Sequence, residues 1–300
     1  MLLPPSTFKK YILHPLEAVF AVAVYGLFWL MPIRMASAVG GWLGSSIGPH
    51  LGLSRRAIKN LKRAMPELSD PEINRIVVDM WNNLGRNAGE FPSLSKLDIY
   101  GPDSHIEVVG AEHIEALRDD GKPGIFISGH FANWEIPAIS IFQRGLTPDV
   151  VYREANNRLL GWLYVQGRSA NEGAKIPKGA HGARQIVQCM RDNRHLGLLI
   201  DQKMNDGIAV PFFGIEAMTA PAVGEMARRY DCPVVPVQVQ RLEGINLKVT
   251  VSPPMELQKS DNQRADVLEN MTRINALFEK WIRENPAQWL WLHNRWPDEK

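Results

Sequence analysis

The sequence predicts an α/β fold in which a central, mostly parallel β-sheet is flanked by helices. Short apolar, β-branched runs alternate with segments of helical periodicity over the second two-thirds of the chain. This alternation is typical of parallel sheets that carry helices on their faces. The length of 300 residues and the hydrophobic content of 45% provide enough apolar surface for a sizeable core.

The predicted elements follow one another from residue 70 onwards. An amphipathic helix begins with Asp70 as its expected cap and Pro71 in its first turn, and its polar tail over residues 86–90 is interpreted as a solvated helix end. A last helix carries an apolar stripe from Val267 to Ile282. Between them, the predicted strands are 106–109, 125–127, 150–152, 196–200, 234–239 and 247–251, and the predicted helices are 112–118, 136–143, 158–168, 183–190 and 222–229.

Residues 1–54 differ in composition from the rest and are predicted to form N-terminal membrane-anchor helices, with a catalytic domain over residues 55–300. Sixteen uncharged residues, Ala18 to Ile33, would span about 24 Å as a helix, against about 30 Å for the hydrocarbon core of a bilayer. We therefore expect the segment to span the inner membrane or to tilt into one leaflet; a helical hairpin buried on the core is the alternative. Positive charge is denser after the segment than before it, which favours a cytoplasmic catalytic domain.

Charge and cysteine content exclude several classes of protein. The formal net charge of +2 is too small to indicate nucleic-acid binding. Cys189 and Cys232 lie in different predicted elements without metal-ligand spacing, so both are interpreted as small buried residues in a reducing compartment. The histidines share no metal spacing either, and we expect no metal and no cofactor.

The stretch from Ser128 to Glu135 is the strongest candidate for catalysis. His130 follows a buried strand at Gly129, which permits a tight turn, and Glu135 lies at the start of the next helix. From there the carboxylate can fold back to the imidazole, fix its tautomer and leave the other ring nitrogen free to accept a proton from a hydroxyl. The sequence therefore predicts His130 as a general base that Glu135 orients.

Further candidates follow other predicted strands, whose carboxyl ends meet at one edge of a parallel sheet. Arg153 is placed to reach a phosphate or thioester oxygen. Asp201 is interpreted as a turn residue or as a residue that orients Arg153 or Lys203. Phe212 and Phe213, before a turn at Gly214, are either core residues or the lining of an acyl pocket. The remaining candidates for substrate binding are Asn133, Asn156 and Pro221, the last in a helix start capped by Thr219.

Taken in order, these motifs resemble the bacterial lipid A late acyltransferases of the lauroyl and myristoyl transferase type, within the His-x4-Asp/Glu lysophospholipid acyltransferases. The similar segments are His130-x4-Glu135, Tyr152-Arg153 with Asn156, Asp201-Gln202, Phe212-Phe213-Gly214, Pro221 and the closing run from Pro286 to Trp296. The last position of the His-x4-Asp/Glu motif is Asp or Glu, and this chain has Glu135 there. Asp201 is followed by Gln202, and no histidine stands beside it. The tryptophans of the closing run are expected to rest on the bilayer or to pack under the anchor.

The resemblance implies a glycerolipid acyltransferase-like αβα fold and transfer of a fatty acyl chain from a thioester on acyl carrier protein. The acceptor that it implies is a hydroxyl of a Kdo-bearing lipid A precursor, and the implied location is the inner membrane, with membrane lipid as a further partner. Donors for the tetrahedral oxyanion are expected among the backbone amides near Gly129 or after Pro221.

Three alternatives stay open from the sequence alone. For an acyltransferase with these residues, a lysophospholipid or an aminolipid is an alternative acceptor. A hydrolase would use His130 and Glu135 on water but needs a third metal ligand for which the sequence offers no clear candidate. A non-catalytic membrane-associated binding protein would tolerate substitution of both residues.

Overall fold

The computed structural model describes residues 13–152 and 157–296. It contains a seven-stranded sheet with the strand order β1-β9-β8-β2-β5-β3-β4. All neighbouring pairs are parallel except β8 and β9, so the predicted α/β fold with a mostly parallel sheet is confirmed. The strands are β1 (Ile106–Val109), β2 (Ile125–Ser128), β3 (Pro148–Tyr152), β4 (Lys175–Pro177), β5 (His195–Leu199), β8 (Val234–Arg241) and β9 (Leu247–Val251).

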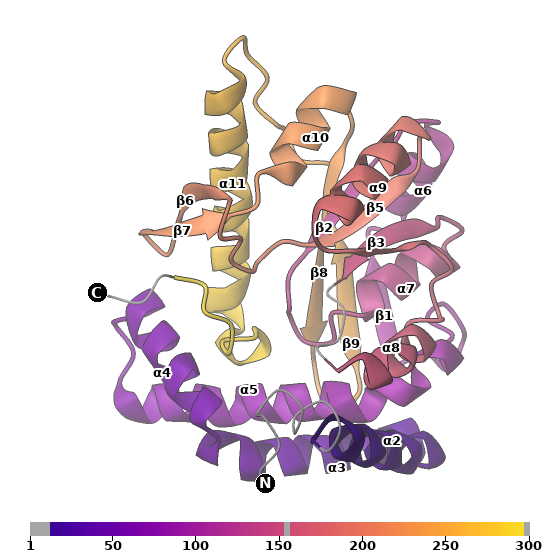
Figure 1. Ribbon diagram of the computed structural model, residues 1–300, viewed down its shortest axis with the longest axis vertical. Helices are drawn as coiled ribbons and strands as arrows, with labels where there is room; N and C mark the ends of the chain where they lie inside the picture. Colours follow the sequence, from indigo (N-terminus) through magenta and orange to yellow (C-terminus); the bar gives the residue numbers. More distant parts are fainter. Residues whose placement is uncertain (1–12, 153–156, 297–300) are drawn as a thin grey trace, which may run out of the picture.

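Helices cover both faces of this sheet. Figure 1 shows α11 on one side of the strands and α6 and α7 on the other. The central strand β2 is fully buried, because β5 and β8 flank it and helices lie above and below it. The helices of this part are α6 (Glu112–Asp119), α7 (Ile136–Gln143), α8 (Gly161–Gly167), α9 (Ala180–Arg191), α10 (Ala222–Tyr230) and α11 (Gln263–Glu284), with short 3-10 turns η4 (Arg158–Leu160) and η5 (Pro286–Gln288).

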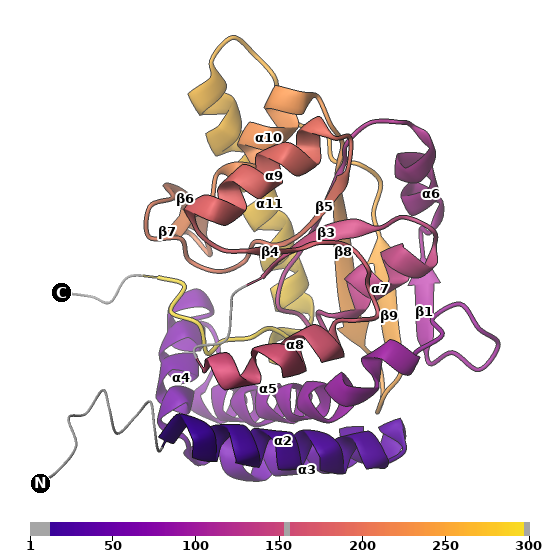
Figure 2. The same ribbon diagram turned by 45° about the vertical axis from the view of Figure 1, so that its right-hand side comes forward.

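A layer of long helices forms the base of the molecule. The helix α5 runs beneath the sheet, and α2 and α3 lie side by side beneath α5 (Figures 1 and 2). This layer consists of α2 (His14–Leu30), α3 (Ile33–Ile47), η2 (Gly48–His50), α4 (Gly52–Ala64), α5 (Asp70–Glu90) and η3 (Phe91–Lys96).

Small residues allow α3 and α5 to approach until their backbones touch. A Cβ atom added to Gly85 of α5 would lie 2.0 Å from the carbonyl oxygen of Gly40 in α3, and one added to Gly44 would lie 2.1 Å from the carbonyl oxygen of Trp81. Real Cβ atoms do not occur at such distances, so only glycine fits. The contact ties the N-terminal helices rigidly to α5.

Several features differ from the sequence-based expectation. The cap of α5 is Ser69, whose side chain and Glu72 form a reciprocal capping box, and not Asp70. The polar tail of α5 is not a solvated helix end, since Asn87 and Glu90 are buried. A separate antiparallel hairpin of β6 (Ile208–Phe212) and β7 (Ile215–Thr219) packs against α11 and was not predicted.

Within the described residues, no helix combines the length and the apolar character that a membrane crossing requires. Cys189 and Cys232 are both free and buried, as predicted.

Candidate active site

His130 lies in the loop that follows β2 and precedes α7. Gly129 makes this loop possible, because an added Cβ would lie 2.6 Å from the ring of Phe131 and 3.2 Å from the Cβ of Asp201. The loop then runs back along the C-terminal segment, where Phe131 forms an isolated antiparallel bridge with Trp289. The imidazole is 16% exposed, so the ring is held by protein while one side stays accessible.

The carboxylate partner of His130 is Asp201. The Nδ1 atom of the ring lies 2.8 Å from Oδ1 of Asp201, and the backbone N–H of His130 donates to Oδ2 at 2.9 Å. Trp289 donates its indole N–H to the same Oδ2 at 2.8 Å. Asp201 reaches this place because it follows β5, the parallel neighbour of β2, so the two strands end at one edge of the sheet.

The surroundings of Asp201 keep it ionised. Burial by itself raises the pKa of the carboxyl, but the charge of the imidazolium form of His130 and the hydrogen bonds from His130 and Trp289 outweigh burial, and the pKa falls to about 2. An ionised carboxylate at Nδ1 requires the ring to carry its proton there. In the neutral ring Nε2 of His130 is then the nitrogen without a proton, and its neighbour is the side-chain amide of Gln202 at 3.3 Å.

Glu135 does not contact the imidazole, contrary to the expectation from the sequence. Its two oxygens accept from Nε and Nη2 of Arg168 at 2.8 and 2.6 Å, in a bidentate ion pair. The physical reason is the local fold: Glu135 precedes α7 and faces α8, which carries the chain to Arg168, whereas the imidazole faces the end of β5. Asp201 occupies the position that the sequence assigned to Glu135.

An apolar cavity opens beside this ion pair. It has an empty volume of about 740 Å³, part of which is open to solvent, and its walls come from β2, β3, β5, α7 and the segment after α8. Trp134 lines the cavity and also contacts the imidazole, with 5.2 Å between the two ring centroids. Apolar residues form most of the wall, and polar side chains enter it at Ser128, Glu135, Arg168, Asn171 and Lys175.

Residues 6–298, nearly the whole chain, match the sequence model of the family "Bacterial lipid A biosynthesis acyltransferase". The chain belongs to this family. The resemblance noted in the sequence is thereby confirmed, and this lipid A acyltransferase family member is an enzyme that transfers acyl groups.

Curated relatives of the family align over almost the whole chain at low identity. The palmitoleoyltransferase of lipid A biosynthesis from Escherichia coli (strain K12) is 24% identical, over 97% of this chain and 95% of the relative. The lauroyltransferase of the same organism is 26% identical, over 96% of this chain and 94% of the relative. The myristoyltransferase is 26% identical, over 95% and 88%. The three names differ in the acyl group transferred, so the family supports late acylation of lipid A without specifying the chain length.

The other predicted site residues of this acyltransferase do not all lie at the cavity or next to His130. Arg153 and Asn156 lie outside the described residues. Asn133 is buried and donates to Glu90, away from the cavity. Lys203 uses its backbone N–H to donate to Nε2 of His293 at 2.9 Å. Asp201 lies at the sheet edge as expected, but its partner is His130.

The Phe212-Phe213-Gly214 run forms the turn of the β6–β7 hairpin and not the end of a strand of the main sheet. Phe213 and Gly214 both have positive φ angles, of 54° and 70°. Phe212 is 1% exposed and stacks on Trp296. Neither phenylalanine is among the residues that line the apolar cavity, so the alternative of core residues describes them.

Pro221 precedes α10, but Thr219 does not cap that helix. The hydroxyl of Thr219 donates to the carbonyl of Ala217 and accepts from Arg295. Arg295 is fully buried and also donates to the carbonyl of Met218 at 2.9 Å. The C-terminal segment thus holds the β6–β7 hairpin in place, and its tryptophans are interior residues: Trp289 and Trp296 are 1% exposed and Trp291 is 0% exposed.

Sequence reasoning missed Ser128, Arg168 and Trp289 as site residues of this acyltransferase. The hydroxyl of Ser128 lines the cavity and is a buried oxygen without a hydrogen-bond partner among the described residues. Its position directly after the buried strand β2 was the available signal. Arg168 and Trp289 come from elements 33 and 88 residues distant from their partners Glu135 and Asp201, and nothing in the local sequence indicates such contacts.

Proposed function

We propose that the protein transfers a fatty acyl chain from a thioester on acyl carrier protein to a hydroxyl of a lipid A precursor, with His130 as general base. The observation that carries the proposal is the 2.8 Å contact between Nδ1 of His130 and Asp201 beside an apolar cavity. In the reaction, the acceptor oxygen attacks the thioester carbonyl carbon while Nε2 takes its proton. The C–S bond of the tetrahedral intermediate then breaks, and the imidazolium returns the proton to the thiolate sulfur.

Asp201 holds the ring and stabilises the imidazolium that forms during this step. Because the carboxylate is bound by His130 and Trp289 and stays ionised, it need not accept a proton itself. A positioned general base contributes about 10²- to 10⁴-fold to a rate. The rest of the acceleration must come from orientation of the two substrates and from donors to the oxyanion, for which we propose the backbone amides near Gly129.

The apolar cavity is our proposed site for the acyl chain of the donor. Its walls exclude water from the chain, and Trp134 connects the wall to the catalytic imidazole. The Glu135–Arg168 pair lines the same cavity. We propose that Glu135 acts there by holding Arg168, and that Arg153, Asn156 and Lys203 contact phosphate or thioester oxygens of the substrates.

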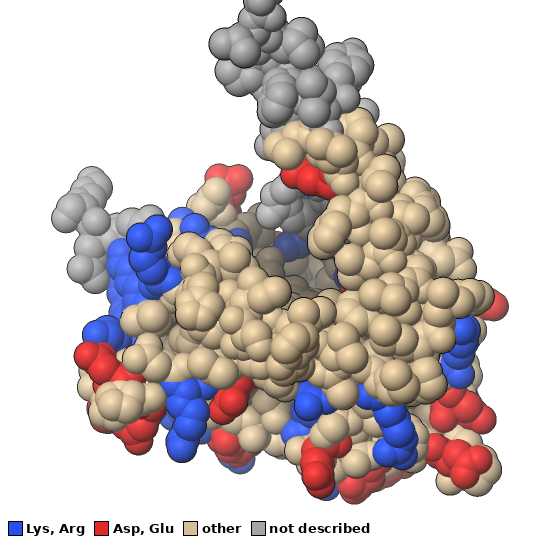
Figure 3. All heavy atoms as spheres, turned by 90° about the horizontal axis from the view of Figure 1, so that it is seen from below, with Lys and Arg blue, Asp and Glu red and all other residues tan. Residues whose placement is uncertain are grey.

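We further propose that the protein lies on the inner membrane through α2 and α3, as the anchor formed by residues 1–54. From His14 to Ile47 only Glu17 and Arg34 carry charge. Seen from below, the middle of this side is a broad uncharged area, and basic and acidic side chains lie around its edge, with one group of basic side chains at the left (Figure 3). The most exposed apolar side chains on it are Leu16, Val19, Phe20, Leu30 and Trp42, which are 63–75% exposed.

Such a surface is suited to the boundary between headgroups and acyl chains. Amphipathic helices bind there with their apolar side buried, and basic residues beside them attract anionic lipids. The basic helix α4, with Arg55, Lys59 and Arg63, supplies that charge next to the apolar helices. Since α5 contacts the loop of His130 on one side and α3 on the other, this orientation brings the catalytic edge toward the bilayer, on the cytoplasmic side.

The test is acyl transfer by purified protein from acyl carrier protein thioester to a panel of acceptors, followed by mass spectrometry of the lipids. We expect a Kdo-bearing lipid A precursor to gain one acyl chain, and His130→Ala to lose the transfer while it stays folded, as measured by circular dichroism. His181→Ala, an exposed histidine on α9, is the matched control. If only a lysophospholipid is acylated, the proposed lipid A acceptor is wrong. Full activity of His130→Ala would contradict the mechanism.

A further inference from the structure

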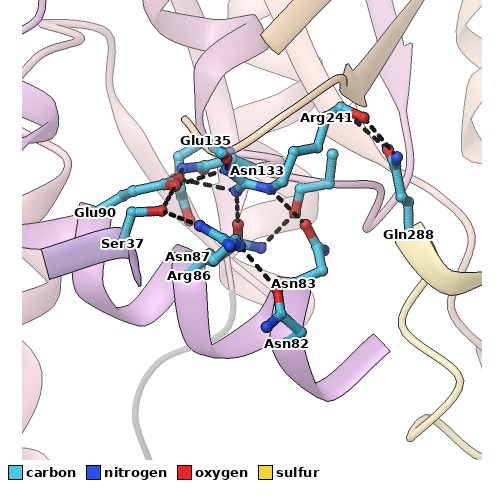
Figure 4. A network of polar contacts seen from close by, with 12 residues as sticks. Ser37, Asn82, Asn83, Arg86, Asn87, Glu90, Asn133, Glu135, Arg241 and Gln288 are labelled. Carbon is cyan, nitrogen blue, oxygen red and sulfur yellow. Dashed lines mark hydrogen bonds and ion pairs between the residues drawn. The ribbon is translucent and has the colours of Figure 1, made fainter. Parts of the chain in front are cut away.

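Arg241, at the end of β8, lies at the centre of a buried polar network between α5 and the catalytic loop (Figure 4). Its guanidinium has five N–H donors, and the structure supplies five acceptors for them. These acceptors are Oδ1 of Asn83 at 2.9 Å, Oδ1 of Asn87 at 2.8 Å, the two oxygens of Glu90 at 2.6 and 3.0 Å, and the carbonyl of Gly244 at 2.9 Å.

This arrangement fixes the side-chain amides of two asparagines. A guanidinium can only donate, so Asn83 and Asn87 must both turn their oxygens toward Arg241. Their NH2 groups then face the opposite way, and both donate to the carbonyl oxygen of Ala132, Asn83 at 3.2 Å and Asn87 at a closer distance. The orientation of these donors is therefore a direct consequence of the charge on Arg241.

Ala132 needs this support because its backbone is strained. It has a φ angle of 39°, in the left-handed region that residues with a Cβ rarely adopt, and it is completely buried. Its N–H donates to the carbonyl of Gln288 at 2.8 Å. The side chain of Gln288 is bound in turn to the backbone N–H and carbonyl of Arg241, at 2.8 and 2.7 Å. The backbone carbonyl of Ala132 is thus linked to Arg241 through Asn83 and Asn87, and its backbone N–H is linked to Arg241 through Gln288.

We infer that Arg241 is a positioning residue for catalysis: through Asn83, Asn87 and Gln288 it clamps Ala132 in the left-handed conformation that sets the place of His130, two residues earlier. The inference rests on the proposed acyl transfer with His130 as base. Strained backbone conformations persist only where the surroundings determine them from several sides, and they concentrate at functional sites.

The burial of the ion pair in this network agrees with such a role. Glu90 is 3% exposed in its side chain and Arg241 is 8% exposed, and Ser37 and Asn133 donate to the remaining positions on Glu90 at 2.7 Å each. A buried ion pair contributes little to stability compared with an apolar packing of similar volume. Its presence directly beneath the His130 loop indicates that its value lies in geometry, where an error of about 1 Å can cost about 100-fold in rate.

The test replaces each asparagine by aspartate. The carboxylate of Asn87→Asp or Asn83→Asp still accepts from Arg241, so the fold keeps its ion-pair network, but it cannot donate to the carbonyl of Ala132. We expect kcat to fall about 100-fold in Asn87→Asp, with both KM values within about twofold of the wild type. The thermal midpoint also falls, because a carboxylate oxygen then faces the buried carbonyl oxygen of Ala132, so kcat is measured well below the midpoint of the variant. A kcat equal to that of the wild type in both aspartate variants would overturn the inference.

A second substitution separates positioning from stability. Ala132→Gly removes the Cβ that makes the left-handed conformation costly, so combining it with Asn87→Asp should restore at least about fivefold of the lost kcat. Absence of this rescue would argue against the clamp.

The control is an ion pair away from the site, in which the partly exposed Arg228 of α10 binds the buried Asp266 of α11. Arg241→Lys, which cannot reproduce five directed donors, should lower kcat strongly, whereas Arg228→Lys should lower only the thermal midpoint. Equal losses of kcat in the two lysine variants would reduce Arg241 to a structural role. If the wild type itself transfers no acyl group, the proposed function fails; if it transfers and the Asn87→Asp variant does so equally well, only the inference fails.

Discussion

The Nδ1 atom of His130 lies 2.8 Å from Oδ1 of Asp201, a residue 71 positions further along the chain. The two meet because β2 and β5 are parallel neighbours and their carboxyl ends share one edge of the sheet. The relationship divides the work expected of one acid in the His130-x4-Glu135 motif between two residues. Asp201 binds the imidazole, and Glu135 binds Arg168.

Replacing Asp201 by asparagine should therefore impair the chemical step. The amide cannot hold the proton on Nδ1 by charge, so the ring loses both its tautomer and the stabilisation of its protonated form. We expect kcat to fall by about 10³- to 10⁴-fold, measured as initial rates of acyl transfer. Trp289→Phe, which removes one hydrogen bond from the same carboxylate, should give a smaller loss of about tenfold. Wild-type kcat in Asp201→Asn would contradict the assignment.

Glu135→Gln should show a different kinetic pattern. The glutamine keeps one acceptor for Arg168 but loses the charge, so the bidentate pair beside the cavity weakens. We expect KM for the acyl donor to rise about tenfold while kcat changes by less than about threefold, because the contact of Asp201 with the imidazole is intact. A loss confined to kcat would instead assign Glu135 to the chemical step.

Ser128→Ala should separate substrate binding from protein stability. Among the described residues the buried hydroxyl has no hydrogen-bond partner, and removing an unsatisfied polar group should leave the thermal midpoint unchanged or raise it. If the hydroxyl binds a polar group of the acyl donor, the same substitution raises KM for the donor several-fold. A lowered midpoint with unchanged KM would show that the hydroxyl only serves the fold.

Because of His293, the free energy of unfolding should decrease as the pH is lowered. Burial, above all, lowers the pKa of this imidazole to about 4, against an ordinary value near 6.5 in the unfolded chain. Between these two values the unfolded state binds more protons, so the stabilising contribution is complete above about pH 6.5 and is lost as the pH falls toward 4. Urea unfolding at pH 7 and pH 5 measures the loss, and a His293→Gln variant should show a smaller one.

Gly85→Ala tests the close contact between α3 and α5. The added methyl would lie 2.0 Å from the carbonyl oxygen of Gly40, and overpacking of this kind costs about 1–3 kcal/mol. Gly26→Ala in α2 is the control, because no atom of the described residues lies within 4 Å of its added Cβ and alanine is the better helix former. Thermal unfolding of both variants in detergent should show a lower midpoint for Gly85→Ala alone.

The sequence predicts the sheet well because strands and helices are encoded locally. Ile106–Val109, Ile136–Gln143 and Leu247–Val251 begin and end where their hydrophobic pattern does. The location of His130 and Asp201 at one edge also follows from the pattern, since both come after strands of a parallel sheet.

The contacts within the site are not local and could not be predicted in the same way. A five-residue spacing suggests that Glu135 faces His130, but it does not contain Arg168, which takes the carboxylate away. Likewise, Arg241 and Glu90 are 151 positions apart, and no periodicity links the end of a strand to the end of a distant helix. The closing tryptophans have a membrane-like composition, yet fill the interior because α11 returns them to the catalytic loop.

The dependence of the catalytic loop on residues 288–290 has a consequence for biosynthesis. The carboxylate of Asp201, the amide of Ala132 and the carbonyl of His130 all obtain a partner from this segment. When β2 and β5 have left the ribosome, the nascent chain contains His130 and Asp201 but not yet the later residues that fix the loop and the carboxylate from the other side. The nascent chain gains a competent centre only when these late residues emerge.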